Sequence, residues 1–272
     1  MRVFTFGVSS NSTRLGRVSL KLSSLLRRFI GWNKQLSYAF AERWPRLFAT
    51  RSYNELLRTR IADSLRDAPE AVLEVGGVDR PILTKHGDFE YVGVDIEDKP
   101  SCYDVYDRFL VQSVEDPIHG RYGLIISTTL MEHVPDNRAA VRSMFEALTP
   151  GGATHHYVPS KWHPYSIALR AVGPVWQARL IPLLRPGSEE ETGYPAFFDH
   201  CTGRSMRKLF EEVGFERIEV EYFYWATDYF SFLAPLYFLV NLYEQLCDRL
   251  GLGLLGSGFV ISARKPSSRA TR

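Results

Sequence analysis

Short apolar runs alternate with amphipathic segments between residues 53 and 158 of the chain. A short apolar run bounded by turn residues is typical of a buried strand, whereas apolar residues three and four positions apart indicate a helix. The expected strands lie at 71–75, at 91–95, near 110, at 124–126 and at 154–158, and the expected helices lie at 53–64, near 83 and at 139–148. This alternation predicts an α/β fold, a doubly wound, Rossmann-like and mostly parallel sheet.

The same pattern continues after residue 200. A helix is expected at 202–214, and strands at 217–222 and 258–263 would complete a seven-stranded sheet. An apolar, aromatic segment at 229–240, within an expected helix at about 229–250, is shorter than the roughly twenty residues that span a bilayer. It either packs on the sheet as a cover helix or dips into a membrane interface. Residues 160–200 are expected to form a second cover insert.

The first fifty residues are expected to form a basic helical extension. No acidic residue precedes Glu42, and seven arginines and lysines do. Apolar residues recur at helical spacing between Leu15 and Phe29 with basic residues between them, which indicates a basic amphipathic helix. Three interpretations stay open: a helix packed on the domain, a helix on an anionic membrane surface, or, in a eukaryotic source, a transit peptide.

Composition narrows the function classes. The 272 residues fit one large domain at 51–265, followed by a flexible tail at 266–272. A net charge of +2 gives no reason to expect a nucleic-acid partner. The three cysteines are far apart and have no metal-ligand spacing, so no metal site is expected. They suit a cytoplasmic protein, with a possible peripheral position on the cytoplasmic face of the membrane.

A glycine pair and two acidic residues indicate a nucleotide-type cofactor. Gly76 and Gly77 follow the first strand, and Asp95 ends the next strand about twenty residues after Glu74. Glycines let the backbone approach a ligand, and a carboxylate at this spacing can accept hydrogen bonds from a ribose. The residues after Gly76 lack the two later glycines of a dinucleotide fingerprint. A nicotinamide dehydrogenase is therefore disfavoured.

Four motifs in order resemble class I S-adenosylmethionine (SAM)-dependent methyltransferases of the small-molecule group. They are the glycine turn at 74–78, the acidic strand end at Asp95, the segment 130–134 (Leu-Met-Glu-His-Val) and the Leu-Thr-Pro-Gly-Gly turn at 148–152. The resemblance implies SAM as the cofactor. It implies methyl transfer to a small-molecule, sugar or lipid-linked acceptor, on oxygen.

The resemblance also assigns site residues. Glu74, Gly76 and Gly77 would border the methionine end of SAM, and Asp95 would hold the ribose hydroxyls. The other residues assigned to the cofactor are Ile96 against the adenine, Ser113 and the Val114 amide at the adenine edge, and Ser127 in the fourth strand. The chain departs from the family pattern at Val78, which replaces a glycine, at Ser113, which replaces an aspartate, and at Gly123. These departures leave a competing hypothesis, a non-catalytic SAM-binding or membrane-associated scaffold.

Methyl transfer mainly requires alignment of the acceptor, and a general base is optional. A histidine near neutral pKa can take a proton from a hydroxyl. The candidates for a catalytic role are His133, His163 and His200. His155 and His156 alternate across a strand, so at most one of them is expected to face the site.

Overall fold

The computed structural model describes residues 12–85, 87–173, 176 and 195–267. Its seven strands form one sheet in the order β3-β2-β1-β4-β5-β7-β6, and β7 runs antiparallel to both neighbours. The strands are β1 (Ala71–Val75), β2 (Glu90–Asp95), β3 (Arg108–Val111), β4 (Tyr122–Thr128), β5 (Leu148–Pro159), β6 (Glu216–Phe223) and β7 (Gly258–Arg264). The predicted α/β fold with a seven-stranded, mostly parallel sheet is confirmed.

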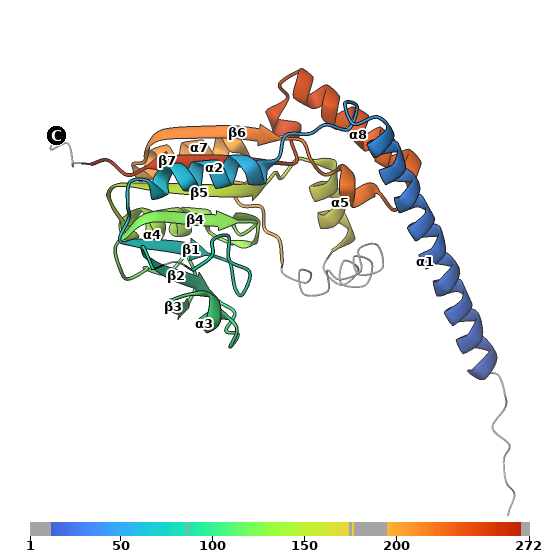
Figure 1. Ribbon diagram of the computed structural model, residues 1–272, viewed down its shortest axis with the longest axis horizontal. Helices are drawn as coiled ribbons and strands as arrows, with labels where there is room; N and C mark the ends of the chain where they lie inside the picture. The colour runs from blue at the N-terminus through green and yellow to red at the C-terminus, as the bar shows by residue number, and fades with distance from the viewer. Residues whose placement is uncertain (1–11, 86, 174–175, 177–194, 268–272) are drawn as a thin grey trace, which may run out of the picture.

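Helices cover both faces of the sheet and enclose two apolar clusters (Figure 1). On one face lie α4 (Asn137–Ala147) and α7 (Gly203–Val213), and on the other lie α2 (Tyr53–Leu65) and the short α3 (Cys102–Val105). Successive strand residues point to opposite faces, so Leu73 and Val75 enter the first cluster and Val72 enters the second. Both faces of the sheet are therefore buried.

Polar caps fix where the main helices begin. Ser52 accepts a hydrogen bond from the N–H of Glu55 at the start of α2, and Thr202 accepts one from the N–H of Ser205 at the start of α7. Gly214 ends α7 with a φ of 112° in the left-handed region that favours glycine. The helix predicted at 202–214 is confirmed to within one residue at each end.

The prediction of a helix near Leu83 is wrong. The described residues between β1 and β2 form turns and bends. The N–H of Ile82 donates to the Glu74 carboxylate, and the N–H of Leu83 donates to the Tyr91 hydroxyl, 3.2 Å away. These amides bind side chains instead of helical carbonyls, and Pro81 has no N–H to contribute.

The N-terminal helix α1 (Ser12–Arg43) packs on α8 (Ala234–Arg249) rather than on the sheet (Figure 1). Asn33 accepts a hydrogen bond from the N–H of Ala234 at 3.1 Å, and the Ser37 hydroxyl donates to the carbonyl of Ser231 at 3.2 Å. The apolar segment expected as one helix at 229–250 divides at Leu233. Before it lies the 3-10 helix η3 (Thr227–Phe230), and after it comes α8.

The remaining elements are α5 (Pro164–Val172) and the 3-10 helices η1 (Met131–His133) and η4 (Gly253–Leu255). The rest of the expected insert, at 174–175 and 177–194, lies outside the described residues, as do the first eleven residues and the tail from 268. Within the described part of the chain, no helix is long and apolar enough to cross a membrane.

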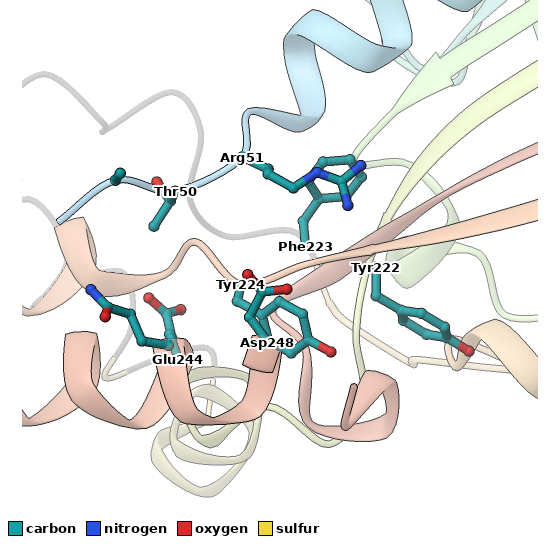
Figure 2. A pocket seen from close by; sticks show the side chains of 9 residues that line it. Thr50, Arg51, Tyr222, Phe223, Tyr224, Glu244 and Asp248 are labelled. Carbon is teal, nitrogen blue, oxygen red and sulfur yellow. The ribbon is translucent and has the colours of Figure 1, made fainter. Parts of the chain in front are cut away.

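The connection from α1 to α2 passes over β6 and α8 and leaves a small cavity there (Figure 2). Its volume of about 20 Å³ has room for a single water molecule. Arg51 closes one side, because its guanidinium forms an ion pair with Glu221 at 2.7 Å and lies 5.6 Å from the centre of the Phe223 ring. This cavity lies where α8 and the α1–α2 connection pack against the sheet.

Candidate functional site

The carboxyl ends of the parallel strands meet where the strand order reverses, between β1 and β4. The strand register places Val75 beside Val94 and Asp95 beside Val111, and it places Thr128, at the end of β4, beside Tyr157 of β5. In open α/β sheets ligands bind in the crevice at this switch point. The segments that leave β1, β2 and β4 therefore border one candidate site.

The turn after β1 is held against its neighbours by backbone packing. The N–H of Gly76 donates to the carbonyl of Val94 at 2.8 Å, and Gly76 has a φ of 82°. A Cβ atom at Gly76 would lie 2.8 Å from Cδ1 of Leu130, in the segment after β4. Only glycine fits this close approach of the β1 turn to the β4 exit.

Glu74 stabilises the turn from inside the fold. Its buried carboxylate accepts hydrogen bonds from the N–H of Ile82 and from the hydroxyl of Tyr91. A Cβ at Gly77 would lie 2.5 Å from Oε1 of Glu74 and would clash with the Tyr106 hydroxyl. Burial raises the pKa of Glu74 to about 7. The structure thus directs the Glu74 carboxylate toward protein groups, whereas the sequence placed it at the methionine end of the cofactor.

Asp95 ends β2 as a partly buried carboxylate. Its Oδ1 accepts a hydrogen bond from the N–H of Glu97 at 2.9 Å, which fixes the side chain at the edge of the sheet. Desolvation raises its pKa. The neighbouring Ile96 side chain is 68% exposed, as an apolar surface for a planar ring would require.

The segment after β3 is tied to the start of α4. The Ser113 hydroxyl donates to Glu115 Oε2 at 3.1 Å, and Glu115 Oε1 accepts from the N–H of Asp136 at 2.8 Å. The Val114 side chain belongs to the apolar core. The segment expected to meet the adenine therefore begins next to Asp95, where the N–H of Gln112 donates to the Asp95 carbonyl, and its Ser113 hydroxyl is engaged with Glu115.

Ser127 lies inside the sheet with a fully buried side chain. Its hydroxyl is 2.7 Å from Nδ1 of His156, and the other ring nitrogen of His156 contacts the Thr154 hydroxyl. His155 is held in the same way between Ser64 and Ser262, at 2.8 Å from each hydroxyl. Burial lowers the pKa of both histidines to about 3, so both are neutral core residues. The structure gives the Ser127 side chain a partner in the core and not at the site surface.

Glu132 and His133 form the exit turn of β4. The Nδ1–H of His133 donates to the carbonyl of Pro195 at 2.9 Å, and its Nε2 lies 3.7 Å from Oε1 of Glu132. The imidazole is about one-third exposed, and desolvation lowers its pKa. Glu132 is buried, its Oε2 makes no hydrogen bond, and burial raises its pKa to about 8. The turn thus presents two neutral titratable groups at neutral pH.

The other two candidate histidines have different environments. His163 is buried, and its Nδ1 accepts the N–H of Tyr165 as the N-cap of α5, while Nε2 lies 3.4 Å from Glu244. This histidine joins α5 to α8. His200 is one-third exposed, and its Nδ1 lies 2.8 Å from Oδ1 of Asp199. It lines a cavity of about 200 Å³ beside the end of β5, together with Lys161, Trp162, Asp199, Cys201, Thr202 and Ser205.

An aromatic cluster that sequence reasoning missed covers the same end of the sheet. Tyr53 of α2 stacks on Tyr157 of β5 with ring centres 3.6 Å apart, and Tyr165 of α5 stacks on Tyr229 of η3 at 4.1 Å. Burial raises the pKa of Tyr53 and of Tyr157, and the Glu132 carboxylate adds to the rise in both. These aromatic residues come from four separate elements, and no local pattern marks them as a group.

The comparisons with known proteins give the family. A family model described as a methyltransferase domain matches residues 33–220, more than half of the chain. The chain belongs to this family. The resemblance to class I SAM-dependent methyltransferases is confirmed, and SAM is the cofactor. No curated protein matches the chain.

Several solved structures resemble this methyltransferase at low identity. A SAM-dependent methyltransferase from Archaeoglobus fulgidus is 13% identical over 84% of this chain and 99% of its own, with a TM-score of 0.45. The N-methyltransferase NodS from Bradyrhizobium japonicum, in complex with S-adenosyl-L-homocysteine, is 12% identical over 78% and 86%, with a TM-score of 0.44. A possible exported protein from Bordetella parapertussis is 19% identical over 77% and 68%, with a TM-score of 0.42.

The departure at Val78 has a visible consequence in this methyltransferase. Val78, which the sequence motif places at a family glycine, has a φ of 46°, in the left-handed region that a β-branched residue rarely adopts. Thr129, after β4, has a φ of 52°. Such strain clusters at functional sites. The residues around the site fit SAM, since Gly76 permits close approach and Asp95 supplies a carboxylate for ribose hydroxyls.

Metal ligands are not grouped in the described part of the chain. No set of three or more His, Cys, Asp and Glu side chains is placed there to hold a metal ion.

Proposed function

We propose that this methyltransferase transfers the methyl group of SAM to an oxygen atom of a small-molecule acceptor, a sugar or a lipid-linked intermediate. The observation that carries the choice of oxygen is the state of His133. Its Nδ1–H is held by a carbonyl, which can only accept, so the lone pair of the neutral ring is on Nε2. The lowered pKa keeps this ring neutral at neutral pH. Nε2 can then take the proton that a hydroxyl loses during methyl transfer.

The cofactor supplies an electrophilic methyl carbon on its sulfonium, and the chain's residues align the two reactants. Asp95 would accept hydrogen bonds from the ribose hydroxyls, and the Gly76 backbone would border the methionine end. The exposed Ile96 would pack on the adenine. Tyr53 and Tyr157, stacked on each other at this end of the sheet, would help to exclude water from the reacting atoms.

The cavity lined by Trp162 and His200 supports a sugar-type acceptor. A concave site with one aromatic ring and several polar groups suits a ligand with many hydroxyls and an apolar C–H face. Trp162 is 45% exposed, and the Arg170 guanidinium lies 5.6 Å from the centre of its ring. Asp199 orients the His200 ring at 2.8 Å. In this arrangement His200 binds the acceptor and His133 serves as the base.

The test has a binding step and a transfer step. Calorimetry with SAM is expected to show binding that Asp95→Ala weakens at least about tenfold and that Asp88→Ala leaves unchanged. Asp88 is an exposed acid between β1 and β2 and serves as the matched control. No SAM binding, or equal binding by the Asp95→Ala variant, would overturn the proposal.

The transfer step uses SAM with a ¹³C-labelled methyl group and cell extract. The labelled product is expected to show the carbon chemical shift of a methoxy group. An N-methyl or C-methyl shift would overturn the choice of oxygen. SAM binding without transfer to any extract component would favour the non-catalytic alternative, for which the strained Val78 and the engaged Ser113 are the structural grounds.

A further inference from the structure

We infer that α1, together with α8, docks this protein on the surface of an anionic bilayer. The argument starts from the exposed apolar side chains of α1. Leu25, Phe29 and Trp32 are four and three residues apart, so they share one face of the helix. They are 61%, 50% and 61% exposed. Exposed leucine, phenylalanine and tryptophan side chains at this spacing form an apolar patch, which lowers the solubility of a protein unless another surface covers it.

The partner helix does not cover this face. The contacts of α1 with α8 and the preceding turn run through other residues. Asn33 and Ser37 make the hydrogen bonds to Ala234 and Ser231, and the rings of Tyr38 and Phe40 contact those of Tyr237 and Phe238. In Figure 1 the N-terminal half of α1 extends past the end of α8 and away from the sheet. The face that holds Leu25 and Phe29 therefore has no protein surface against it in the described part of the chain.

A second apolar stripe lies on α8 itself. Leu239, Leu242 and Leu246 of the helix and Leu250 at its C-cap recur at three- and four-residue intervals, and each is at least 55% exposed. Most of the exposed large apolar side chains in the described residues lie on α1, on α8 or in the segments that follow them. Two neighbouring helices thus expose apolar stripes. Their combined exposed apolar surface is larger than that of the single apolar residues that are normal on a protein surface.

The charge of α1 favours an anionic bilayer over a second copy of the chain as the surface that covers these stripes. Arg27 and Arg28 are exposed beside the apolar face of α1, and the sequence has no acidic residue before Glu42. A bilayer with anionic lipids attracts such a segment electrostatically, and each basic residue near the surface adds to the attraction. A second copy of the chain would instead bring two basic helices together. Trp32 also suits the headgroup level of a bilayer, where tryptophan is enriched.

The position of α1 relates the docking surface to the candidate site. In Figure 1, α1, α8 and α5 lie beyond the edge of the sheet at which β4 ends, which is the edge that carries the site. Helices lying in the bilayer surface would hold that edge close to the membrane. An acceptor with a lipid anchor would then reach the site without leaving the bilayer. The docking itself does not depend on which acceptor is used.

The experiment measures cosedimentation of the full chain with two kinds of vesicle. One is pure phosphatidylcholine, and the other is phosphatidylcholine mixed with phosphatidylglycerol. The protein is expected to bind the mixed vesicles and to be released by high salt, because the attraction is partly electrostatic. The triple variant Leu25→Gln, Phe29→Gln, Trp32→Gln is expected to lose at least about tenfold in partition coefficient.

Two further variants separate the contributions. Arg27→Gln with Arg28→Gln is expected to weaken binding to the mixed vesicles several-fold, whereas Gln35→Ala, at an exposed polar position of the same helix, leaves it unchanged. All substituted side chains are exposed, so unfolding curves and SAM affinity should match those of the wild type. Absence of binding to the mixed vesicles would overturn the inference. Binding that the triple variant leaves intact would also overturn it. A third contrary result is a protein that does not bind vesicles but self-associates in sedimentation, with the triple variant abolishing the self-association.

Discussion

The ring of His133 is oriented by the carbonyl oxygen of Pro195, which accepts its Nδ1–H at 2.9 Å. Pro195 belongs to the segment before α7, and that segment also donates the N–H groups of Phe197 and Phe198 to the carbonyl of Glu132, at 2.8 and 3.0 Å. His133 and Pro195 are 62 residues apart in sequence, yet their two segments form one structural unit. The orientation of the proposed base is therefore set by the segment that precedes α7.

Replacement of His133 by glutamine is expected to lower kcat by about a hundredfold or more, the usual contribution of a general base. SAM affinity should stay unchanged, because His133 is not a cofactor residue. His200→Gln is expected to raise KM for the acceptor with a smaller effect on kcat. A wild-type kcat in the His133→Gln variant, measured by labelled methyl transfer, would contradict the assignment.

The pH profile gives a second measurement of the same residue. The base works in its neutral form, and burial lowers the pKa of His133 below its ordinary value of 6.5. The rate of the wild type should thus stay level as pH falls toward 6.5 and decline only below it. An acid limb centred above pH 6.5 would show that a different group serves as the base.

Val78→Gly tests the strain in the cofactor turn. A left-handed conformation costs a β-branched residue about 1–3 kcal/mol, whereas glycine adopts it freely. We expect SAM to bind several-fold more tightly, with the free energy of unfolding within about 1 kcal/mol of the wild type, since lost side-chain packing offsets the released strain. Calorimetry and urea unfolding measure the two quantities.

The control for Val78→Gly is Val105→Gly. Val105 packs on the same apolar cluster, but it lies in α3 and has no positive φ. Glycine there relieves no strain and should lower the free energy of unfolding by at least about 1 kcal/mol. Equal losses of stability in the two variants would show that the left-handed conformation of Val78 stores no usable strain.

The sequence predicts those parts of the fold that depend on local pattern. The apolar runs place β1 and β4 correctly because buried strands need continuous apolar residues, and Gly214 ends α7 because the left-handed cap favours glycine. The family motifs likewise predict the methyltransferase domain. The length of α1 and its packing on α8 have no such local signal.

The parts that the sequence does not predict depend on contacts between distant residues. The helix expected near Leu83 does not form because Glu74 and Tyr91 capture the amides of Ile82 and Leu83. The buried position of Ser127 depends on its pairing with His156 across two strands. Glu132 is part of a motif, but no local pattern predicts its burial in the fold, which raises its pKa and leaves Oε2 without a hydrogen bond.

Glu132→Gln tests that raised pKa through stability. Its folded-state pKa of about 8 exceeds the unfolded value of about 4.5, so the folded state keeps a proton that the unfolded state releases between these pH values. The contribution of Glu132 to stability is therefore full below pH 4.5 and is lost as pH rises to 8. Urea unfolding should show the variant close to the wild type at pH 5 and more stable at pH 8. Glu216→Gln, at an exposed carboxylate, should show no such pH-dependent gain.

Gly77→Ala tests the packing that holds Glu74 in place. An added Cβ would lie 2.5 Å from Oε1 of Glu74 and would clash with the Tyr106 hydroxyl, and neither group can move easily because Glu74 and Tyr106 are both 1% exposed. We expect a loss of about 1–3 kcal/mol in the free energy of unfolding, as for other overpacked sites. Gly87→Ala is the matched control, because nothing lies within 4 Å of the added atom in the same connection. Urea unfolding of both variants decides the matter: equal stabilities would mean that the Gly77 turn has room to relax, and the buried Glu74 carboxylate would then not require glycine at this position.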